Sequence, residues 1–565
     1  MMMRRRIWIP LLASTLLLGA CADDEGAIGG IDGEEYNNSA GGDPAENQSG
    51  GAPPPDDDGD DANDDFEPEE EEFLVQQVAS TDSYVFVPNQ ADDSETVAII
   101  DGWEFTVFPV RVGLEPSQVV AAEVEDQGSV AYVLSGSTPT VAVVRADQGQ
   151  GGERADVRML SVPHEVNELA ISPDGRHVLA YINPDKPIDD SASAASLQSM
   201  AMIRLGDEPG QDEVYELSVT RFIDKIGFSD DSDRAFVVGE DGINLIELGE
   251  IKGDAFISRI ELDLAGDLFP PQDREVVFSS DGVTMAMRTS QFEGLGIFEL
   301  DAEDARLDEE RIIDLDGVPT DISLMESDDG ALEVVATLRE QEQVVLIDVD
   351  EAMVADEEDD SYVRVVDTAG IDAGIARVTP DQSAIVLYST LPEIPVVGLL
   401  DPQEESVEAF ELRNQIRSLE VSSDGRTAVV VHRAQENLVA SGDPEEEFRR
   451  GEGVTLWDLD SGYRRPIGLR SHPEEIAMVD DSSGTPLLYV MLVDDDAVDQ
   501  GLKRINLTSF GTDFSWIPRR PTQLGAVGDQ VFVSQMEATG RITFFDVDTQ
   551  SQRTVSGYEL NAGIQ

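Results

Sequence analysis

The chain of 565 residues repeats one pattern along most of its length: an apolar run, a tight polar turn that contains Asp, and a second apolar run. The clearest copies turn at Ser172–Gly175 and Ser422–Gly425, and Ser279–Gly282 forms a third. An Asp-Gly pair between apolar runs is a strong hairpin signal, because the primed turns that suit hairpins need positive φ angles. Ten such units follow one another at spacings of 43 to 57 residues, with turns at Asp82, Asp126, Asp174, Asp231, Asp281, Asp329, Asp381, Asp424, Asp481 and Asp529.

Each turn is followed by two further strand-like runs, such as Val454–Leu459 and Tyr463–Leu469 in the eighth unit. Four short strands in a unit of about 40 to 50 residues is the period of a β-propeller blade. We therefore predict an all-β fold, a β-propeller of four-stranded antiparallel blades. Ten units exceed the roughly four to eight blades that are usual, so seven to ten blades, in one ring or two, fit the count. A parallel α/β fold is disfavoured because no segment between strands has a helical period, and Glu351–Asp360 is interpreted as an acidic linker.

Three segments resemble known propeller repeats. Ser172–Gly175 resembles the turn of TolB-like and YVTN-type repeats, and Tyr84–Asn89 followed by Val97–Asp101 is similar to the YVTN strand pair. Val454–Leu459 resembles the closing strand of a WD40 repeat, although the Gly-His pair of that family is missing and Trp-Asp occurs once. The resemblance covers about 490 residues as a generic repeat, and it specifies the fold far better than the function.

The N-terminus has the pattern of an export signal. Three arginines, Arg4–Arg6, precede the apolar run Ile7–Leu18, which is too short to span a bilayer comfortably. Cys21, the only cysteine, follows Leu-Gly-Ala and resembles the lipobox of bacterial lipoproteins. That resemblance implies a signal peptide over residues 1–21, acylation of Cys21 with palmitate-type chains, and, because Ala22 is not Asp, placement at the outer membrane. The alternative is an ordinary signal peptide that contains a cysteine.

Residues 22–72 contain 20 acidic residues and no basic residue, interrupted by Gly, Pro, Asn and Ser. Such a segment repels itself and cannot bury apolar surface, so we predict a disordered acidic linker before a propeller domain over residues 73–565. The formal net charge of the whole chain is −80, which excludes nucleic acid as a partner because a polyanion would be repelled. A single cysteine excludes a disulfide framework.

The longest insertions between the predicted strands are 184–198, 434–452, 494–501 and 263–274. In a blade whose strands A to D run from the inside outward, all four fall in B-to-C or D-to-A connections, and therefore on one face. Insertions on one face often mark a binding surface, so we predict the functional surface there. The alternative is that insertions accumulate harmlessly on a solvent-exposed face.

No nucleophile elbow, P-loop, dinucleotide fingerprint or His-Glu-x-x-His motif is present. The four histidines, His164, His177, His432 and His472, lie in separate repeats and are predicted to be structural. The carboxylate clusters Asp494–Asp496 with Asp499, and Asp230–Asp231 with Asp233, have a density fit for Ca²⁺ but lack EF-hand spacing. Asp-rich turns are more often hairpin caps, since Asp bonds its own backbone.

From these observations we expect a membrane-anchored lipoprotein of the bacterial envelope whose propeller is a non-catalytic module that binds a protein, a peptide or a glycan. No catalytic, metal-ligating or ligand-binding residue is assigned, Cys21 is the predicted lipidation site, and Ca²⁺ is the one cofactor considered. Two alternatives stay open. One is a propeller enzyme, lactonase-like or of the quinoprotein type, with a metal ion at the ring axis. The other is a purely structural or salt-buffering surface protein.

Overall fold

The computed structural model describes residues 79–558 except 90–93, 148–153, 185, 187–197, 241, 261–267, 271–272, 302–305, 328–329, 357–359, 392–395, 436–443, 495–497 and 538. The predicted signal peptide with Cys21 and the predicted linker 22–72 lie outside these residues, as do 73–78 at the start of the predicted domain. The domain boundaries and the lipidation site therefore stay predictions.

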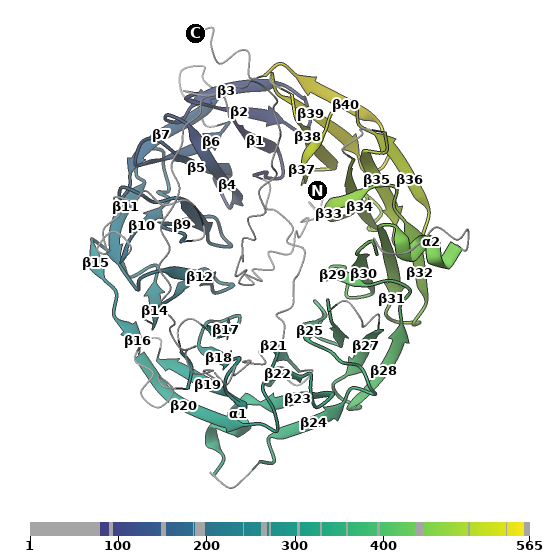
Figure 1. Ribbon diagram of the computed structural model, residues 1–565. Coiled ribbons are helices and arrows are strands. Elements are labelled where there is room, and N and C mark those ends of the chain that lie inside the picture. The colour runs from purple at the N-terminus through teal and green to yellow at the C-terminus, as the bar shows by residue number, and fades with distance from the viewer. Residues whose placement is uncertain are drawn as a thin grey trace, which may run out of the picture. The chain divides into compact units, whose positions relative to one another are not determined.

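Ten sheets stand around a central axis as the blades of one propeller (Figure 1), and the consecutive strands of each blade pair in antiparallel fashion. The all-β fold is confirmed, and all ten repeat units are blades. The strands of the first five blades, from the inside outward, are β1 (Tyr84–Pro88), β2 (Thr96–Asp101) and β3 (Val107–Arg111); β4 (Pro116–Val124), β5 (Gly128–Ser135), β6 (Thr140–Ala146) and β7 (Ala155–Ser161); β8 (Glu168–Ile171), β9 (His177–Tyr181), β10 (Ser199–Arg204) and β11 (Glu213–Ser218); β12 (Ile223–Phe228), β13 (Arg234–Gly239), β14 (Gly242–Glu247) and β16 (Arg259–Ile260); β17 (Arg274–Phe278), β18 (Thr284–Thr289), β19 (Gly294–Asp301) and β20 (Arg306–Asp314).

Blades 6 to 10 follow in the same way. Their strands are β21 (Asp321–Glu326), β22 (Leu332–Leu338), β23 (Gln343–Asp348) and β24 (Val363–Asp367); β25 (Ile375–Val378), β26 (Ile385–Tyr388), β27 (Val396–Asp401) and β28 (Ser406–Glu411); β29 (Ile416–Val421), β30 (Thr427–His432), β31 (Gly453–Asp458) and β32 (Arg464–Gly468); β33 (His472–Asp480), β34 (Pro486–Val493), β35 (Gly501–Asn506) and β36 (Thr512–Trp516); β37 (Pro521–Val527), β38 (Gln530–Gln535), β39 (Arg541–Asp546) and β40 (Gln552–Ser556). In blade 1 the place of the innermost strand is taken by a single antiparallel β-bridge between Ser80 and Val85.

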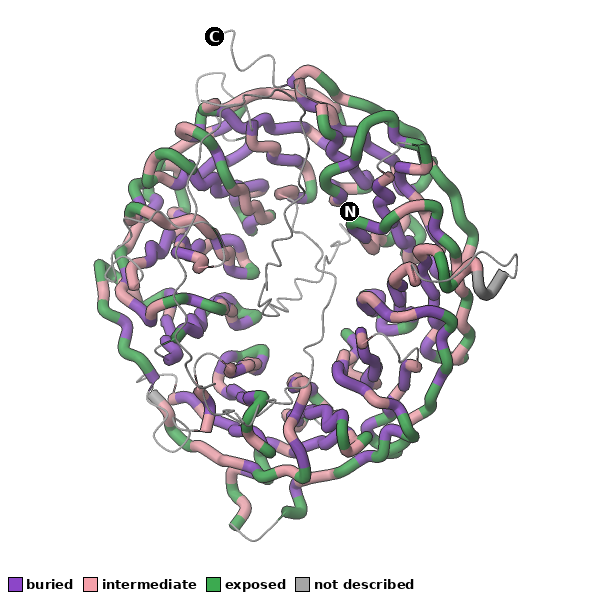
Figure 2. Tube along the Cα trace, in the orientation of Figure 1, coloured by how far each residue is buried: buried purple, intermediate pink, exposed green. Residues whose placement is uncertain are grey.

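The hydrophobic core lies between the blades. Ten clusters of buried side chains each combine residues of two neighbouring blades, and one of them joins blade 10 to blade 1. Figure 2 shows buried positions along the middle of the sheets and exposed positions on the outer strands and turns. Each blade buries its two faces against the two neighbouring blades. Side-chain packing between blades therefore holds the ring together.

The A-to-B turns use a recurring Ser-x-Asp cap. In blade 8, Ser422 Oγ donates to Asp424 Oδ1 at 2.6 Å and accepts from Thr427 N at 3.0 Å, while Gly425 N donates to Ser422 O at 2.8 Å. Blades 3, 4 and 5 repeat the Ser-Asp bond at 2.6 to 2.7 Å. The expected primed turn is wrong: Gly425 has a φ of +72°, but Asp424 keeps a negative φ. The side-chain cap supplies the hydrogen bonds that a two-residue turn would lack, and only the last turn residue must be left-handed.

The C-to-D turns use a related cap, which explains the Trp-Asp pair of blade 8. Asp458 Oδ1 accepts from Ser461 N at 2.8 Å, and Gly462 follows with a φ of +68°. Trp457, which precedes it, is fully buried and lies edge-on to Phe410 with ring centroids 5.0 Å apart. The Asp at the end of strand C is therefore a turn cap, and the Trp is a core residue.

Gly282→Ala is expected to destabilise the ring through its turn. Gly282 has a φ of +69°, and a Cβ there would lie 2.4 Å from Cζ of the buried Phe236 in the preceding blade. The left-handed backbone costs a non-glycine residue about 1 to 2 kcal/mol, and overpacking adds roughly 1 to 3 kcal/mol. Gly210→Ala is the matched control, because Gly210 has a φ of +91° but no atom within 4 Å of its Cβ position. Equal losses of thermal stability in the two variants would contradict the expected clash.

Polar side chains at one position of the inner strands connect each of several blades to the next. Each bond joins a side chain to the main chain of the following inner strand: Gln118 Oε1 accepts from Leu169 N at 2.8 Å, Lys225 Nζ donates to Val276 O at 2.9 Å, Asp321 Oδ2 accepts from Ala376 N at 2.8 Å, and Glu475 Oε2 accepts from Leu524 N at 2.5 Å. We call these bonds the inner staples. They explain why charged residues occur inside the ring without forming a site.

Two inner staples make stability depend on pH. Burial raises the pKa of Asp321 to about 7, with Glu275 adding to the shift and Arg288 and Arg377 opposing it, and burial raises the pKa of Glu475 to about 7. Both folded-state pKa values lie above the ordinary ones, so the folded ring holds these protons more tightly than the unfolded chain. The contribution of these two groups to the unfolding free energy is fully present below about pH 4, and it is lost as the pH rises through 7.

The melting temperature is therefore expected to fall between pH 5 and pH 8. The double variant Asp321→Asn/Glu475→Gln keeps an acceptor for each backbone N–H but cannot titrate, so its melting temperature should change less over this range. Glu408→Gln, at an exposed position on the outer strand β28, controls for the general loss of charge. A double variant whose pH profile parallels that of the natural protein would contradict the assignment.

Two connections on the A-to-B and C-to-D face carry structure that the sequence did not indicate. The predicted acidic linker 351–360 overlaps a short helix, α1 (Val349–Val354), in which Val349 and Ala352 are buried. The first residues of the predicted linker are therefore helical. The C-to-D connection of blade 4 contains β15 (Ala255–Phe256), which pairs in parallel with β11 of blade 3. This pairing connects blades 3 and 4 by main-chain hydrogen bonds.

Candidate functional site

The strand order places the four long insertions in B-to-C and D-to-A connections, so their ends lie on one face of the ring, which we call the insertion face. The described part of 434–452 contains α2 (Pro444–Arg450). Phe448 of α2 packs edge-on against the ring of His432 at a centroid distance of 5.4 Å, and Asn414 Nδ2 donates to Phe448 O at 3.2 Å. The C-terminal end of this insertion is thus fixed to the body of blade 8.

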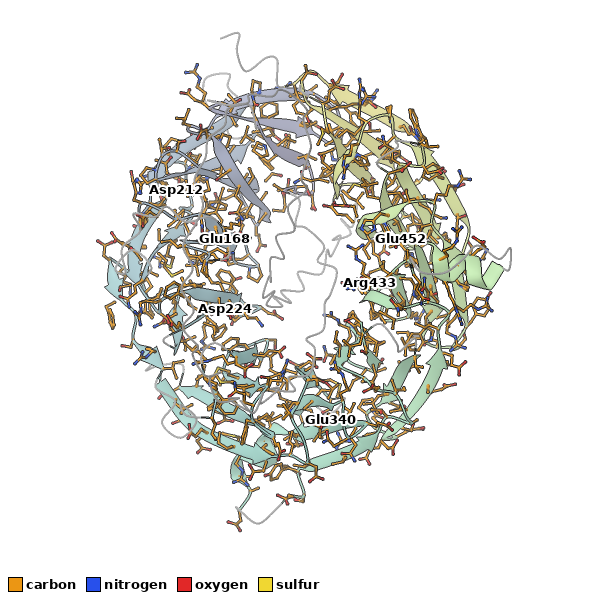
Figure 3. All side chains as sticks on the ribbon, viewed as in Figure 1. Glu168, Asp212, Asp224, Glu340, Arg433 and Glu452 are labelled. Atoms are coloured by element: carbon orange, nitrogen blue, oxygen red, sulfur yellow. The ribbon has the colours of Figure 1, made fainter. Side chains whose placement is uncertain are left out.

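A pocket of about 260 Å³ opens on the insertion face between blades 8 and 9, and it is lined by Arg417, Arg433, Glu452 and His472. Arg417 lies near the start of β29 and His472 at the start of β33, the inner strands of their blades. Arg433 directly follows β30, and Glu452 directly precedes β31 after α2. Figure 3 shows Arg433 and Glu452 on the inner side of the ring. We call this site the arginine pocket.

A hydrogen-bonded chain orders the pocket. His472 Nδ1 lies 3.2 Å from Glu452 Oε1, and His472 Nε2 lies 2.7 Å from Arg417 Nη1, which also donates to Pro473 O at 3.3 Å. Because a guanidinium can only donate, Nε2 must accept, and Nδ1 carries the proton that it donates to Glu452. Glu452 and His472 together hold the side chain of Arg417.

Two guanidinium groups and one carboxylate line the pocket, in a chain whose formal charge is −80. Burial lowers the pKa of Arg417, and the charge of Arg433 lowers it further, while Glu452 and Glu474 oppose the shift. Both guanidinium groups thus lie at the same pocket, together with Glu452.

A wider depression of about 760 Å³ lies on the opposite face, at the C-to-D connection 205–212 of blade 3. Its wall includes a buried network in which Arg145 of blade 2 forms an ion pair with Asp212 and donates from Nε to Gln127 Oε1 at 3.0 Å. Arg204, also in the wall, donates to Leu248 O and Ile251 O at 2.5 and 2.7 Å. These side chains connect neighbouring blades, so the depression is a by-product of blade packing.

The structure separates the roles of three predicted structural histidines. His432 is fully buried, with Nδ1 at 3.0 Å from Gln415 O and Nε2 at 2.7 Å from Thr455 Oγ1, and burial lowers its pKa to about 4. Burial also lowers the pKa of His177, whose Nδ1 has no hydrogen-bond partner among the residues that the structure describes. His472 differs from both because it lines the arginine pocket, which the sequence interpretation missed.

The carboxylates considered for Ca²⁺ are partly accounted for. Asp231 Oδ1 accepts from Ser229 Oγ at 2.7 Å and from Asp233 N at 3.0 Å, so it caps the A-to-B turn of blade 4. Asp494 Oδ2 accepts from Val498 N and Asp499 N, whereas 495–497 lie outside the described residues. Within the described ranges, no three His, Cys, Asp or Glu side chains form a group that could hold a metal ion.

One signal in the sequence could have indicated the arginine pocket. Nine of the 37 basic residues lie within 413–470, all of them arginine. The same segment contains ten acidic residues, so its net charge is −1, and the signal is a unit that is rich in arginine and less acidic than the rest of the chain. Among the residues that the structure describes, no helix combines the length and the apolar character needed to cross a membrane.

No family model matches the chain, and no curated protein matches it. Solved structures similar to it include the dihydro-heme d1 dehydrogenase NirN in complex with DHE, with 16% identity, 71% of this chain and 76% of that chain covered and a TM-score of 0.37. Apo AztD from Citrobacter koseri has 11% identity, with 69% and 96% covered and a TM-score of 0.33. A eukaryotic initiation factor has 9% identity, with 78% and 97% covered and a TM-score of 0.44.

These likenesses concern the fold alone. The ring itself defines the class of protein: a ten-bladed β-propeller with a pocket lined by two arginines on its insertion face.

Proposed function

We propose that the protein is a lipid-anchored lipoprotein of the bacterial envelope, at the outer membrane, whose propeller binds a protein, a peptide or a glycan without catalysing a reaction. The observation that carries the binding role is the arginine pocket beside the insertion 434–452 on the insertion face. Guanidinium groups that line a pocket can form charge-assisted hydrogen bonds with an anionic group. We therefore propose that the pocket recognises an anionic group on a partner.

Anchoring rests on Cys21 and is tested separately. The Cys21→Ser variant should no longer incorporate a labelled palmitate and should leave the membrane fraction, whereas the natural protein should stay with the outer membrane. Two acyl chains give stable attachment, so release should be nearly complete rather than partial. Retention of the unlabelled variant in the membrane fraction would contradict lipid anchoring.

Binding through the insertion face is tested with a photo-crosslinking amino acid at either of two exposed arginines of blade 8. Arg449 lies on α2 at the insertion face, and Arg426 lies in the A-to-B turn on the opposite face. We expect a discrete adduct from position 449 in intact cells and none from position 426. Equal adducts from both positions, or adducts from position 426 alone, would show that the chosen face is wrong.

A further inference from the structure

We propose that the end of the insertion 434–452 is an acid-released latch beside the arginine pocket. The latch consists of Phe448–Glu452, which form the end of α2 and lead into β31. It is docked on blade 8 while the imidazole of His432 is neutral, and it is released when His432 is protonated. The inference concerns regulation of the binding surface and rests on the proposed function only in its choice of face.

Contacts of three kinds hold the latch on the blade. The ring of Phe448 lies edge-on to that of His432 at a centroid distance of 5.4 Å. Asn414, which is only 1% exposed, donates from Nδ2 to Phe448 O at 3.2 Å and to Gly451 O at 3.3 Å. Phe448 also packs on Gly453, because a Cβ at that position would lie 2.6 Å from Phe448 Cε2. The docked latch therefore covers one side of a buried histidine.

The hydrogen bonds of His432 are those of a neutral imidazole. Nδ1 lies 3.0 Å from Gln415 O, and because a carbonyl can only accept, Nδ1 carries the proton. Nε2 lies 2.7 Å from Thr455 Oγ1 and accepts from that hydroxyl. Burial lowers the pKa of His432 to about 4. Hydrogen bonds to the main chain at 414 and 415 and the charge of Glu452 oppose this shift without cancelling it.

Release of the latch would change the surroundings of His432, because water would reach the imidazole once Phe448 leaves it. A hydrated histidine has a pKa of about 6.5, so the released state binds the proton more tightly than the docked state. The ratio of released to docked latch should therefore rise by up to about tenfold for each pH unit between 6.5 and 4. Above that range the ratio should not depend on His432.

Glu452 connects the latch to the arginine pocket. It follows Gly451 in the chain, and its Oε1 lies 3.2 Å from Nδ1 of His472 in the pocket. Release of the latch should thus displace a residue that lines the pocket. Because His472 is also a histidine, the test has to separate its response to pH from that of His432.

The test is a nitroxide spin label on α2, attached to Arg450→Cys in the Cys21→Ser protein, where the added cysteine is the only thiol. Arg450 pairs with Glu447 inside α2, so its replacement leaves the docking contacts of Phe448 in place. Electron paramagnetic resonance gives the mobile and immobile fractions of the label between pH 7.5 and 4.5. We expect the mobile fraction to rise on acidification. A label at Arg426→Cys, on the opposite face of blade 8, should not respond in this way.

Substitutions assign the response to one histidine. His432→Gln keeps a donor and an acceptor but cannot be protonated, so the label on α2 should lose its response to pH. His472→Gln is the matched control and should keep the response. Circular dichroism checks that each variant is folded. The inference is overturned if His432→Gln responds as the natural sequence does, or if His472→Gln abolishes the response.

Gly453→Ala should release the latch without a change of any titratable group. The added methyl group would lie 2.6 Å from Phe448 Cε2, so the label on α2 should be more mobile already at pH 7.5. Gly468→Ala is the control, because Gly468 pairs with Gly453 across β31 and β32 and has open space at its Cβ position among the described residues. Equal mobility in the two variants would contradict the docking of Phe448.

A second measurement needs no change at His432 itself. Nuclear magnetic resonance of protein labelled at histidine Cε1 follows the titration of its imidazole. Phe448→Ala should raise the pKa of His432 from about 4 towards 6.5, because the imidazole is then hydrated. An unchanged titration would overturn the inference even if His432→Gln did not fold. None of these measurements involves a partner, so their failure would leave the tests at Cys21 and at position 449 untouched.

Discussion

Arg145→Met is expected to cost the ring about 3 to 5 kcal/mol of unfolding free energy, because it leaves a buried carboxylate without its partner. The side chains of Arg145 and Asp212 are both fully inaccessible to solvent. Arg145 Nη1 donates to Asp212 Oδ2 at 3.1 Å, and Asp212 Oδ1 accepts from Gly206 N at 3.0 Å. The pair joins β6 of blade 2 to the C-to-D connection of blade 3, so its loss weakens an interface between blades.

Arg158→Gln is the matched control. Its guanidinium lies 3.6 Å from the same Asp212 but is 34% exposed, so its removal should cost at most about 1 kcal/mol. Urea denaturation of the two variants gives the comparison. A further variant, Arg145→Met/Asp212→Leu, should recover much of the loss, since a buried ion pair replaced by apolar groups is often neutral. Equal losses for Arg145→Met and Arg158→Gln would contradict the proposed burial cost.

Phe544→Ala is expected to have an effect of similar size and a different consequence, because it removes packing at the closure of the ring. Phe544 is fully buried between blades 10 and 1, with its ring centroid 5.2 Å from that of Phe105. Truncation of a buried Phe typically costs about 3 to 5 kcal/mol. Within the described residues, blades 1 and 10 share no strand, so this cluster carries the closure.

The matched control is Phe298→Ala, which removes an equally buried ring from the cluster between blades 4 and 5. Blades 4 and 5 are consecutive in the sequence, so the chain still connects them when their packing weakens. Blades 1 and 10 have no such direct connection. Both variants should melt earlier, but only Phe544→Ala should increase the radius of gyration and expose blades 1 and 10 to protease under native conditions. The same cleavage pattern in both variants would show that closure does not depend on this cluster.

The repeat units could be counted from the sequence because each repeats a local signal, but only the structure shows that all ten are blades of one ring. Asp174, Asp281 and Asp424 cap turns through contacts that span only a few residues. Such a local pattern can be recognised in the sequence before the fold is known. The turn type was wrong for a related reason: the Ser hydroxyl two residues earlier changes which φ angles are needed, and Asp-Gly alone does not show it.

The arginine pocket could not be predicted in the same way. Arg417 and His472 are 55 residues apart and belong to different blades, and their contact depends on how inner strands align across the ring. Glu452 joins them only because the insertion containing α2 returns to the body of blade 8. The two-residue strand β15 likewise has no periodicity that a sequence could reveal.

In the part of the chain that the structure describes, the junction of blades 3 and 4 is the one at which strands of two blades pair, through β15 and β11. If the natural ends were linked and the chain were opened between Ser218 and Ile223, the permuted protein would begin with blade 4 and end with blade 3. Its first and last blades would then be held by shared main-chain hydrogen bonds. Such a circular permutant would therefore have main-chain hydrogen bonds between its first and last blades, in addition to side-chain packing.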